Sequence, residues 1–265
     1  MPWEENFKNT IFIHPSSEIG ENVEIGPFSF IDRGVKIGKN TKIENNVILK
    51  EGTIIGENCH IHSGAILGDL PQDLNFKGEK SFLIIGNNVV IREYCVLHRA
   101  SGEGNATIVG DDCYIMAYSH LAHNVKLGKK VVIANATQIA GYVEIDDQAF
   151  VSGLVAIHQF VRIGKLAMVG GSSKIVKDVP PYALVDGNPA RVYGINTVGL
   201  KRANFPLEKR NLIKEIYHIL YSNLPFEERF KKISEYQDDS AREILEFVKN
   251  SKRGITSAIW RRIEE

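Results

Sequence analysis

Cysteine is scarce in this sequence, and its spacing is uninformative for disulfides. The 265 residues include only three cysteines, Cys59, Cys95 and Cys113, and none of them forms a CxxC pair. An odd number of cysteines without paired spacing argues against a disulfide framework and indicates a reducing compartment. We therefore expect three packing thiols rather than disulfides or a cysteine nucleophile.

Net charge and long hydrophobic runs are missing as well. Lys plus Arg equals Asp plus Glu at 32 each, so no overall field attracts nucleic acid or an anionic membrane. No apolar run reaches the roughly 18 residues that a membrane-spanning helix needs. The N-terminal stretch MPWEENFKNTIFIHP carries acidic residues where a secretion signal is basic. These absences predict a cytoplasmic protein with no nucleic-acid partner and no integral membrane segment.

What the sequence has in abundance is an aliphatic residue at every sixth position. The frame runs from Ile13 to Leu67, returns from Ile85 to Leu97, and continues from Val109 to Ile175. A period of six fits neither an α-helix nor an isolated strand, but it fits a coil with three flat sides. Coils of about 18 residues, stacked about 4.8 Å apart, would bury a continuous aliphatic column. The sequence therefore predicts a mainly β protein, a left-handed parallel β-helix of hexapeptide repeats.

Two interruptions and a change of texture divide the chain. Residues 68–83 and 98–107 are polar and glycine-rich, so we expect them to loop outward, where substrate contacts are common. After the last repeat, apolar residues follow helical spacing, as in the stripe Leu212, Ile213, Ile216, Tyr217 and Leu220 and the set Phe226, Phe230 and Ile233. We expect a β-helix domain over 1–194 and a small C-terminal helical domain over 195–265.

Functional residues must lie outside the prism, because aliphatic side chains fill its interior. Histidine titrates near neutrality and suits general-base catalysis. Seven histidines precede the helical tail: His14, His60, His62, His98, His120, His123 and His158. Histidines that share a metal on neighbouring coils would stand about 18 residues apart, and His62 and His123 have no such partner in an uninterrupted block. We therefore expect no metal site. The frame places Leu121 inward and directs His123 to a corner.

Several motifs occurring together point to one family. The hexapeptide repeats alone would not separate acyltransferases from acetyltransferases. With the motifs added, the chain resembles the acyl carrier protein-dependent UDP-N-acetylglucosamine O-acyltransferases that begin lipid A synthesis, over nearly its whole length. The motifs are IGPFSFI, PQDLNFKGE, REYCVLHRAS, SHLAHNVKLG, IAGYVEIDDQAFVSGLVAIHQFVRIG, MVGGSSKIVKDVPPYALVDGNPA and NTVGLKRANF.

The resemblance implies a reaction and two catalytic groups. The reaction transfers an (R)-3-hydroxyacyl chain from an acyl carrier protein thioester to the 3-position of a UDP-aminosugar. By matching motifs, His123 is the general base and the backbone amide of Gly141 is the oxyanion donor. Asn124 follows the base where the family usually has aspartate, so it can orient the imidazole without offsetting its charge. Tyr142 stands where the family usually has histidine.

The resemblance also implies binding residues and partners. Gln72, Asp73 and His120 are expected to hold the aminosugar, and His158 and Gln159 to line the cleft. Asn196 and Arg202 are expected near the nucleotide and the carrier's phosphopantetheine, and Gly171 near the end of the acyl chain. These are the implied site residues. No further cofactor is implied, and the expected partners are acyl carrier protein, a UDP-aminosugar and two further copies in a homotrimer.

Two alternatives stay open at this level. The first is another acyltransferase on the same fold, such as an N-acyltransferase. It is disfavoured because the repeats begin by Ile13 and leave no room for the N-terminal uridine-binding domain of such enzymes. The second is a non-catalytic or diverged paralogue, which Asn124 and Tyr142 would support. The sequence leaves open whether the acceptor is a 3-hydroxyl or a 3-amino group.

Overall fold

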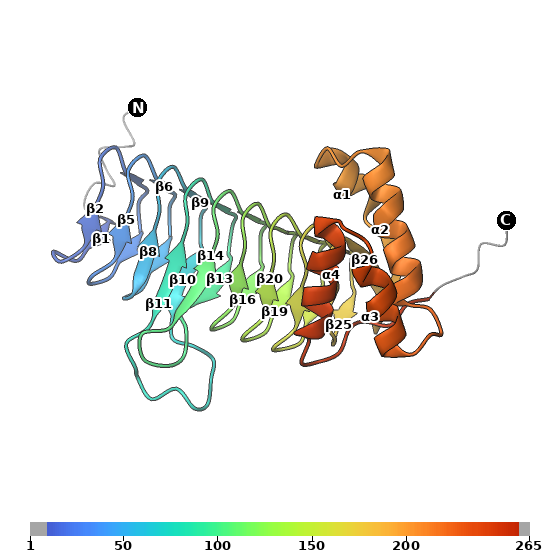
Figure 1. The fold of residues 1–265 in the computed structure, drawn as a ribbon. Helices are drawn as coiled ribbons and strands as arrows, with labels where there is room; N and C mark the ends of the chain where they lie inside the picture. Colours follow the sequence, from blue (N-terminus) through green and yellow to red (C-terminus); the bar gives the residue numbers. More distant parts are fainter. Residues whose placement is uncertain (1–9, 260–265) are drawn as a thin grey trace.

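The computed structural model describes residues 10–259 as an elongated prism of stacked coils with a helical cap at one end (Figure 1). Residues 1–9 and 260–265, which the expected domain limits include, lie outside the described range. Three parallel sheets form the sides of the prism, and each coil contributes one strand to each sheet. The mainly β prediction, a left-handed parallel β-helix with C-terminal helices, is confirmed.

Each sheet is a ladder of very short strands. The first sheet contains β1 (Phe12–Ile13), β4 (Phe30–Ile31), β7 (Ile48–Leu49), β10 (Ile66–Asp69), β13 (Val96–His98), β16 (His120–Leu121), β19 (Gln138–Ile139), β22 (Ala156–Ile157) and β25 (Lys174–Ile175). The second contains β2 (Glu18–Ile19), β5 (Lys36–Ile37), β8 (Thr53–Ile55), β11 (Phe82–Ile85), β14 (Ala106–Val109), β17 (Lys126–Leu127), β20 (Glu144–Ile145) and β23 (Arg162–Ile163). The third contains β3 (Glu24–Ile25), β6 (Lys42–Ile43), β9 (His60–Ile61), β12 (Val90–Ile91), β15 (Tyr114–Ile115), β18 (Val132–Ile133), β21 (Phe150–Val151), β24 (Met168–Val169), β26 (Ala183–Gly187) and β27 (Ala190–Ile195).

The chain turns at three corners, one between each pair of sheets. The chain passes from the first sheet to the second at the first corner, from the second to the third at the second corner, and from the third back to the first at the third corner. Most corners place one residue in the left-handed backbone region, which asparagine tolerates better than most side chains. At the second corner, for example, Asn22 donates to Asn40 at 3.1 Å and Asn40 donates to Asn58 at 3.2 Å.

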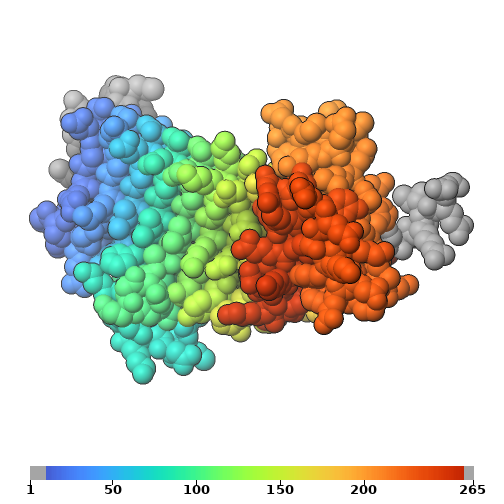
Figure 2. Space-filling model, viewed as in Figure 1, coloured from blue at the N-terminus to red at the C-terminus, as the bar shows by residue number. Residues whose placement is uncertain are grey.

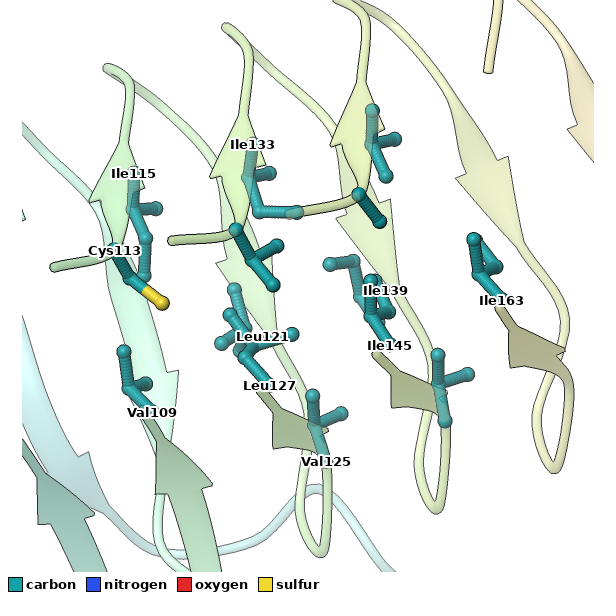
Figure 3. Close-up of a cluster of buried hydrophobic side chains, with 14 of the residues drawn as sticks. Val109, Cys113, Ile115, Leu121, Val125, Leu127, Ile133, Ile139, Ile145 and Ile163 are labelled. Atoms are coloured by element: carbon teal, nitrogen blue, oxygen red, sulfur yellow. The ribbon is translucent and has the colours of Figure 1, made fainter. Parts of the chain in front are cut away.

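The aliphatic frame read from the sequence is the core of the prism. Leu121 pairs in register with Leu97 on one side and Ile139 on the other, and all three side chains are fully buried. Figure 3 shows the same stacking on each side of the prism, with aliphatic side chains meeting inside. In the first described coil, Ile13 and Ile19 are exposed and Ile25 is half-buried, since no described coil lies beyond them to cover them.

Both interruptions project from the first corner, on consecutive coils. They cover residues 70–81 and 99–105, and are shorter than expected because four-residue pairing between β11 and β14 extends the strands into them. In Figures 1 and 2 the first loop stands out from the side of the prism. The two loops therefore overhang the corner turns that follow them.

A helical cap closes the other end of the prism (Figure 1). It follows the antiparallel hairpin of β26 and β27 and contains α1 (Thr197–Arg202), α2 (Leu207–Leu220), α3 (Phe226–Ser234) and α4 (Asp239–Lys249). The buried residues of α2 lie on the predicted stripe, and Tyr217 donates to the carbonyl of Pro181 at 2.5 Å. In α3 the expected stripe holds only in part, because Phe226 is exposed and packs on Phe230 instead. Within residues 10–259, no helix has the length and apolarity needed to cross a bilayer.

Candidate active site at the first corner

The histidine proposed from sequence as the base lies at the first corner, directly after the two projecting loops. His123 follows β16, Gly141 follows β19 and His158 follows β22, so the three residues occupy successive turns of the same corner. Neighbouring coils stack at about the strand spacing of 4.8 Å. The fold therefore brings together groups that are far apart in the sequence and places them beside both loops.

His123 is held by the residue that follows it. Its Nδ1 lies 2.9 Å from Asn124 Oδ1, and Asn124 is buried. The Asn124 amide is itself fixed by the backbone of Ser101 in the second loop. Its oxygen accepts from the Ser101 N–H at 2.9 Å, and its nitrogen donates to the Ser101 carbonyl at 3.0 Å.

This clamp determines the tautomer of His123. The Ser101 N–H is a donor, so the side-chain atom of Asn124 that faces it must be the amide oxygen. The same oxygen faces the His123 ring, so Nδ1 must carry the proton that this oxygen accepts. The proton-free nitrogen is then Nε2, which makes no hydrogen bond with any residue in 10–259. Orientation of a base through its other ring nitrogen is the usual way that histidine is prepared for proton abstraction. The Asn124 amide is therefore placed to orient the imidazole.

Gly141 lies against the ring of His123 from the next coil. A Cβ added there would lie 2.7 Å from both Cε1 and Nε2 of His123, closer than real Cβ contacts. The Gly141 carbonyl accepts from Phe160 N at 3.1 Å, while its own N–H has no hydrogen-bond partner among the described residues. Glycine at this position both admits the imidazole and leaves a backbone donor beside it.

Two aromatic side chains continue the corner beyond His123. The Tyr142 ring meets the His123 ring edge-on, with 5.2 Å between centroids, and stacks on Phe160 at 4.9 Å. Tyr142 thus packs beside the imidazole. His158 and Gln159 are exposed on the same corner, one coil further along.

The first loop brings Asp73 to the same place. Asp73 Oδ1 accepts from the Asn75 N–H at 2.9 Å. That hydrogen bond, the Ser101 hydroxyl and the nearby His123 lower the pKa of Asp73, so its carboxylate is ionised at neutral pH. Gln72, its neighbour, is exposed.

Two further histidines, His98 and His120, lie close to His123. His98 donates from Nδ1 to the carbonyl of Leu70 at 2.5 Å, and its ring meets that of His120 edge-on at 5.1 Å. Burial, with His98 and His123 nearby, lowers the pKa of His120 to about 4, so His120 is neutral. The Nε2 atoms of both rings are buried without a partner in the described chain. Buried polar atoms normally find partners, so these two are placed to meet a ligand.

The sequence pattern predicts no role for His98 or Ser101. His98 ends β13, whose residue Leu97 pairs with Leu121 of β16. The signal that could have found it is this register across the second loop, since it places His98 beside the turn that holds His123. Ser101 gave no signal, because its contact with Asn124 runs through its backbone.

The remaining expected residues lie elsewhere in the chain. Gly171 is exposed at the third corner, after β24, and Asn196 and Arg202 belong to the start and end of α1. Asn196 is the N-cap of α1: its oxygen accepts from Gly199 N at 2.9 Å and its nitrogen donates to the Leu166 carbonyl at 2.9 Å. Asn196 and Arg202 line a cavity of about 560 Å³ next to the third sheet. One chain therefore does not bring these residues to the first corner.

The three cysteines are packing residues, as expected. All are buried and free, and each thiol lies 3.1 Å from a backbone carbonyl oxygen. Burial raises the pKa of Cys95 and of Cys113 to about 11, which keeps both as unreactive thiols.

Family models match most of the chain. Residues 178–256 match the model of UDP N-acetylglucosamine O-acyltransferase domain 2, and residues 106–141 match the bacterial transferase hexapeptide model of six repeats. Residues 7–101 match the model of the GMPPB C-terminal domain.

Individual relatives agree with the first of these models. An acyl-[acyl-carrier-protein]–UDP-N-acetylglucosamine O-acyltransferase from Burkholderia mallei is 39% identical over 196 residues, which is 71% of this chain and 75% of the relative. The same enzyme from Synechocystis is 44% identical over 164 residues, and there the alignment spans only 59% of the relative.

Solved structures extend the likeness to the whole fold. A UDP-N-acetylglucosamine acyltransferase from Bacteroides fragilis superposes with a TM-score of 0.91 at 40% identity, covering 94% of this chain and 98% of that one. The enzyme from Francisella novicida gives a TM-score of 0.91 at 36% identity, covering 95% and 94%. On this evidence the chain belongs to the UDP-N-acetylglucosamine O-acyltransferase family.

Proposed function

We propose that this protein transfers an (R)-3-hydroxyacyl chain from acyl carrier protein to the 3-position of UDP-N-acetylglucosamine or a close UDP-aminosugar, the first step of lipid A biosynthesis. The observation that carries the proposal is the arrangement of His123, whose Nδ1 is tied to Asn124 while Nε2 stays free beside Gly141. The family relatives are named for the same donor and acceptor.

The chemistry needs one base and one oxyanion donor. His123 Nε2 removes the proton of the sugar hydroxyl, which is a weak nucleophile until then, and the oxygen attacks the thioester carbonyl carbon. The Gly141 N–H stabilises the negative charge that develops on the carbonyl oxygen. Collapse of the tetrahedral intermediate forms the ester and expels the phosphopantetheine thiolate, which takes up the proton from His123. No additional cofactor takes part in this scheme.

The polar groups around His123 suit an aminosugar. Neutral His120 has a buried Nε2 free for a sugar hydroxyl, and ionised Asp73 can accept a hydrogen bond from a sugar hydroxyl or amide. Gln72, His158 and Gln159 lie exposed along the same corner and are proposed to line the cleft. The same set could receive a 3-amino group in place of the hydroxyl.

The complete site is proposed to need neighbouring subunits. Gly171 lies at the third corner, and Asn196 and Arg202 belong to α1 in the helical cap, so they reach the acyl chain and the nucleotide of one site only from an adjacent copy. Prisms of this kind can associate side by side, which supports a homotrimer with sites between subunits. Acyl carrier protein is the proposed protein partner, and the free buried thiols agree with the reducing cytoplasm.

The decisive test is acyl transfer followed by mass spectrometry, with UDP-N-acetylglucosamine and its 3-amino analogue offered as separate acceptors. We expect a 3-O-acyl product from the wild type and a loss of at least about 100-fold in His123→Ala, in line with general-base removal. His14→Ala is the matched control, because within residues 10–259 the His14 ring is hydrogen-bonded only to Ser16, at the far end of the prism. Transfer that survives His123→Ala would refute the base, and no transfer to either acceptor would favour the non-catalytic paralogue.

A further inference from the structure

Two histidines and a glutamate converge outside the active site, near the third corner. His60 and His62 flank the inward-pointing Ile61 of β9, so both side chains face outward. Their rings stack with 3.9 Å between centroids. Glu44 lies one coil earlier, opposite His62, because Lys42 pairs with His60 and Ile43 with Ile61.

The ligand atoms of these three side chains are already gathered. Glu44 Oε1 lies 2.8 Å from His60 Nε2 and 3.2 Å from His62 Nδ1, and one donor atom of each residue lies within 4.8 Å of the others. We propose that Glu44, His60 and His62 bind a divalent transition metal ion, and we name Zn²⁺ as that ion. The site is independent of the acyl transfer proposed above.

The carboxylate is oriented for this role by a second residue. Ser63 donates to Glu44 Oε2 from its backbone N–H at 3.2 Å and from its hydroxyl at 2.9 Å. Oε2 is therefore occupied, and Oε1 is the oxygen that faces the two imidazoles. Support of a metal-ligating carboxylate by hydrogen bonds to its other oxygen is characteristic of built metal sites.

The local charges also suit a cation with nitrogen ligands. Glu93 Oε1 lies 3.6 Å from His62 Nδ1, so a second carboxylate lies close to the cluster. The nearby cation Arg92 is paired with Glu93, to which it donates at 2.8 and 3.1 Å. Two imidazoles and one carboxylate match the zinc sites that have three protein ligands and a water in the fourth position. The side chains of His60 and Glu44 are 35% and 27% exposed, which leaves that position open to solvent.

The residue one coil before His62 is Glu44 rather than a histidine. The spacing between histidines therefore predicted no metal site. Magnesium and calcium prefer oxygen ligands, so they should not compete at this site. The metal would join two adjacent coils, and a ligand that binds only the folded state raises its stability.

The test is zinc binding to the chelator-treated full chain by calorimetry. We expect one Zn²⁺ per chain, with affinity at least about 100-fold weaker in His62→Gln and Glu44→Gln, since loss of even a residue that only hydrogen-bonds to a metal ligand weakens metal binding 10–100-fold. Ser63→Ala should weaken it about 10-fold. His14→Gln, which removes a half-buried histidine elsewhere, should bind like the wild type.

A spectroscopic measurement keeps the test independent of variant folding. X-ray absorption at the zinc edge of the wild type should show nitrogen or oxygen ligands at about 2.0–2.1 Å with the scattering of two imidazoles. The proposal is overturned by the absence of saturable binding, by displacement of Zn²⁺ with equimolar Mg²⁺, or by variants that fold and bind as tightly as the wild type. In that case the cluster is only a hydrogen-bonded network.

Discussion

Replacing Asn124 by aspartate would exchange a neutral partner of His123 for a charged one without changing its size. The amide oxygen lies 2.9 Å from His123 Nδ1, so a carboxylate there would stabilise the imidazolium directly. Opposite charges at such distances shift titrations by about 1–3 pH units. We expect the acid limb of the kcat/KM profile for acyl transfer to move upward by at least about one pH unit.

The same substitution should destabilise the protein. The Asn124 nitrogen donates to the Ser101 carbonyl at 3.0 Å, and a carboxylate would place an acceptor against that acceptor. A buried acceptor left without its donor costs about 1–3 kcal/mol. For a chain of this size the unfolding midpoint should fall by roughly 2–4 °C for each kcal/mol. Thermal unfolding followed by circular dichroism measures this loss.

Asn124→Ala separates the two effects. It removes the partner of Nδ1 and the clamp on Ser101 without adding charge, so kcat should fall while the acid limb stays in place. If the profile of Asn124→Asp superimposes on that of the wild type although the variant is folded, Asn124 does not control the proton on His123, and our account of the base is wrong.

Three further changes test other parts of the structure. Gly141→Ala would place a Cβ 2.7 Å from the His123 ring and should displace the base. Acyl transfer should then fall about 100-fold while the far-UV circular dichroism spectrum stays unchanged, and wild-type activity would contradict this packing. Gly171→Met should fold, because a Cβ at Gly171 comes no closer than 3.5 Å to its neighbours, and should shift donor preference to shorter chains. Each methylene denied burial costs about 0.8 kcal/mol, so three cost about 50-fold in kcat/KM, and an unchanged chain preference would exclude Gly171 from the acyl site. Burial raises the pKa of Asp146 to about 6; Glu144 adds to this effect and Arg162 opposes it. Because the folded state favours the protonated carboxyl, the free energy of unfolding of the wild type falls as the pH rises from 4 to 6. Asp146→Asn should therefore stabilise the chain by about 2 kcal/mol at pH 7 and by almost nothing at pH 4 in urea titrations, and equal effects at both pH values would refute the shift.

The repeat predicted the fold well, because a buried column imposes its period on the chain directly. Every short strand from β1 to β25 ends on or includes an aliphatic residue of the six-residue frame. The edges of the interruptions were less accurate, since pairing between β11 and β14 depends on two segments that are far apart in the sequence. The exposed Phe226 was missed for a similar reason: helical spacing predicts a stripe, but only the neighbouring elements decide whether it is covered.

The sequence by itself determined the β-helix, the corner position of His123 and the inert cysteines, because each follows from the local period of the chain. Tertiary structure decided what surrounds those residues. Stacking of coils brought Ser101 to Asn124 and Gly141 to the His123 ring, and it set Glu44 beside His60 and His62. The 18-residue coil alone aligns Gly141 with His123 and Glu44 with His62. Ser101 and Asn124 are 23 positions apart across a loop, so only the folded register brings them together.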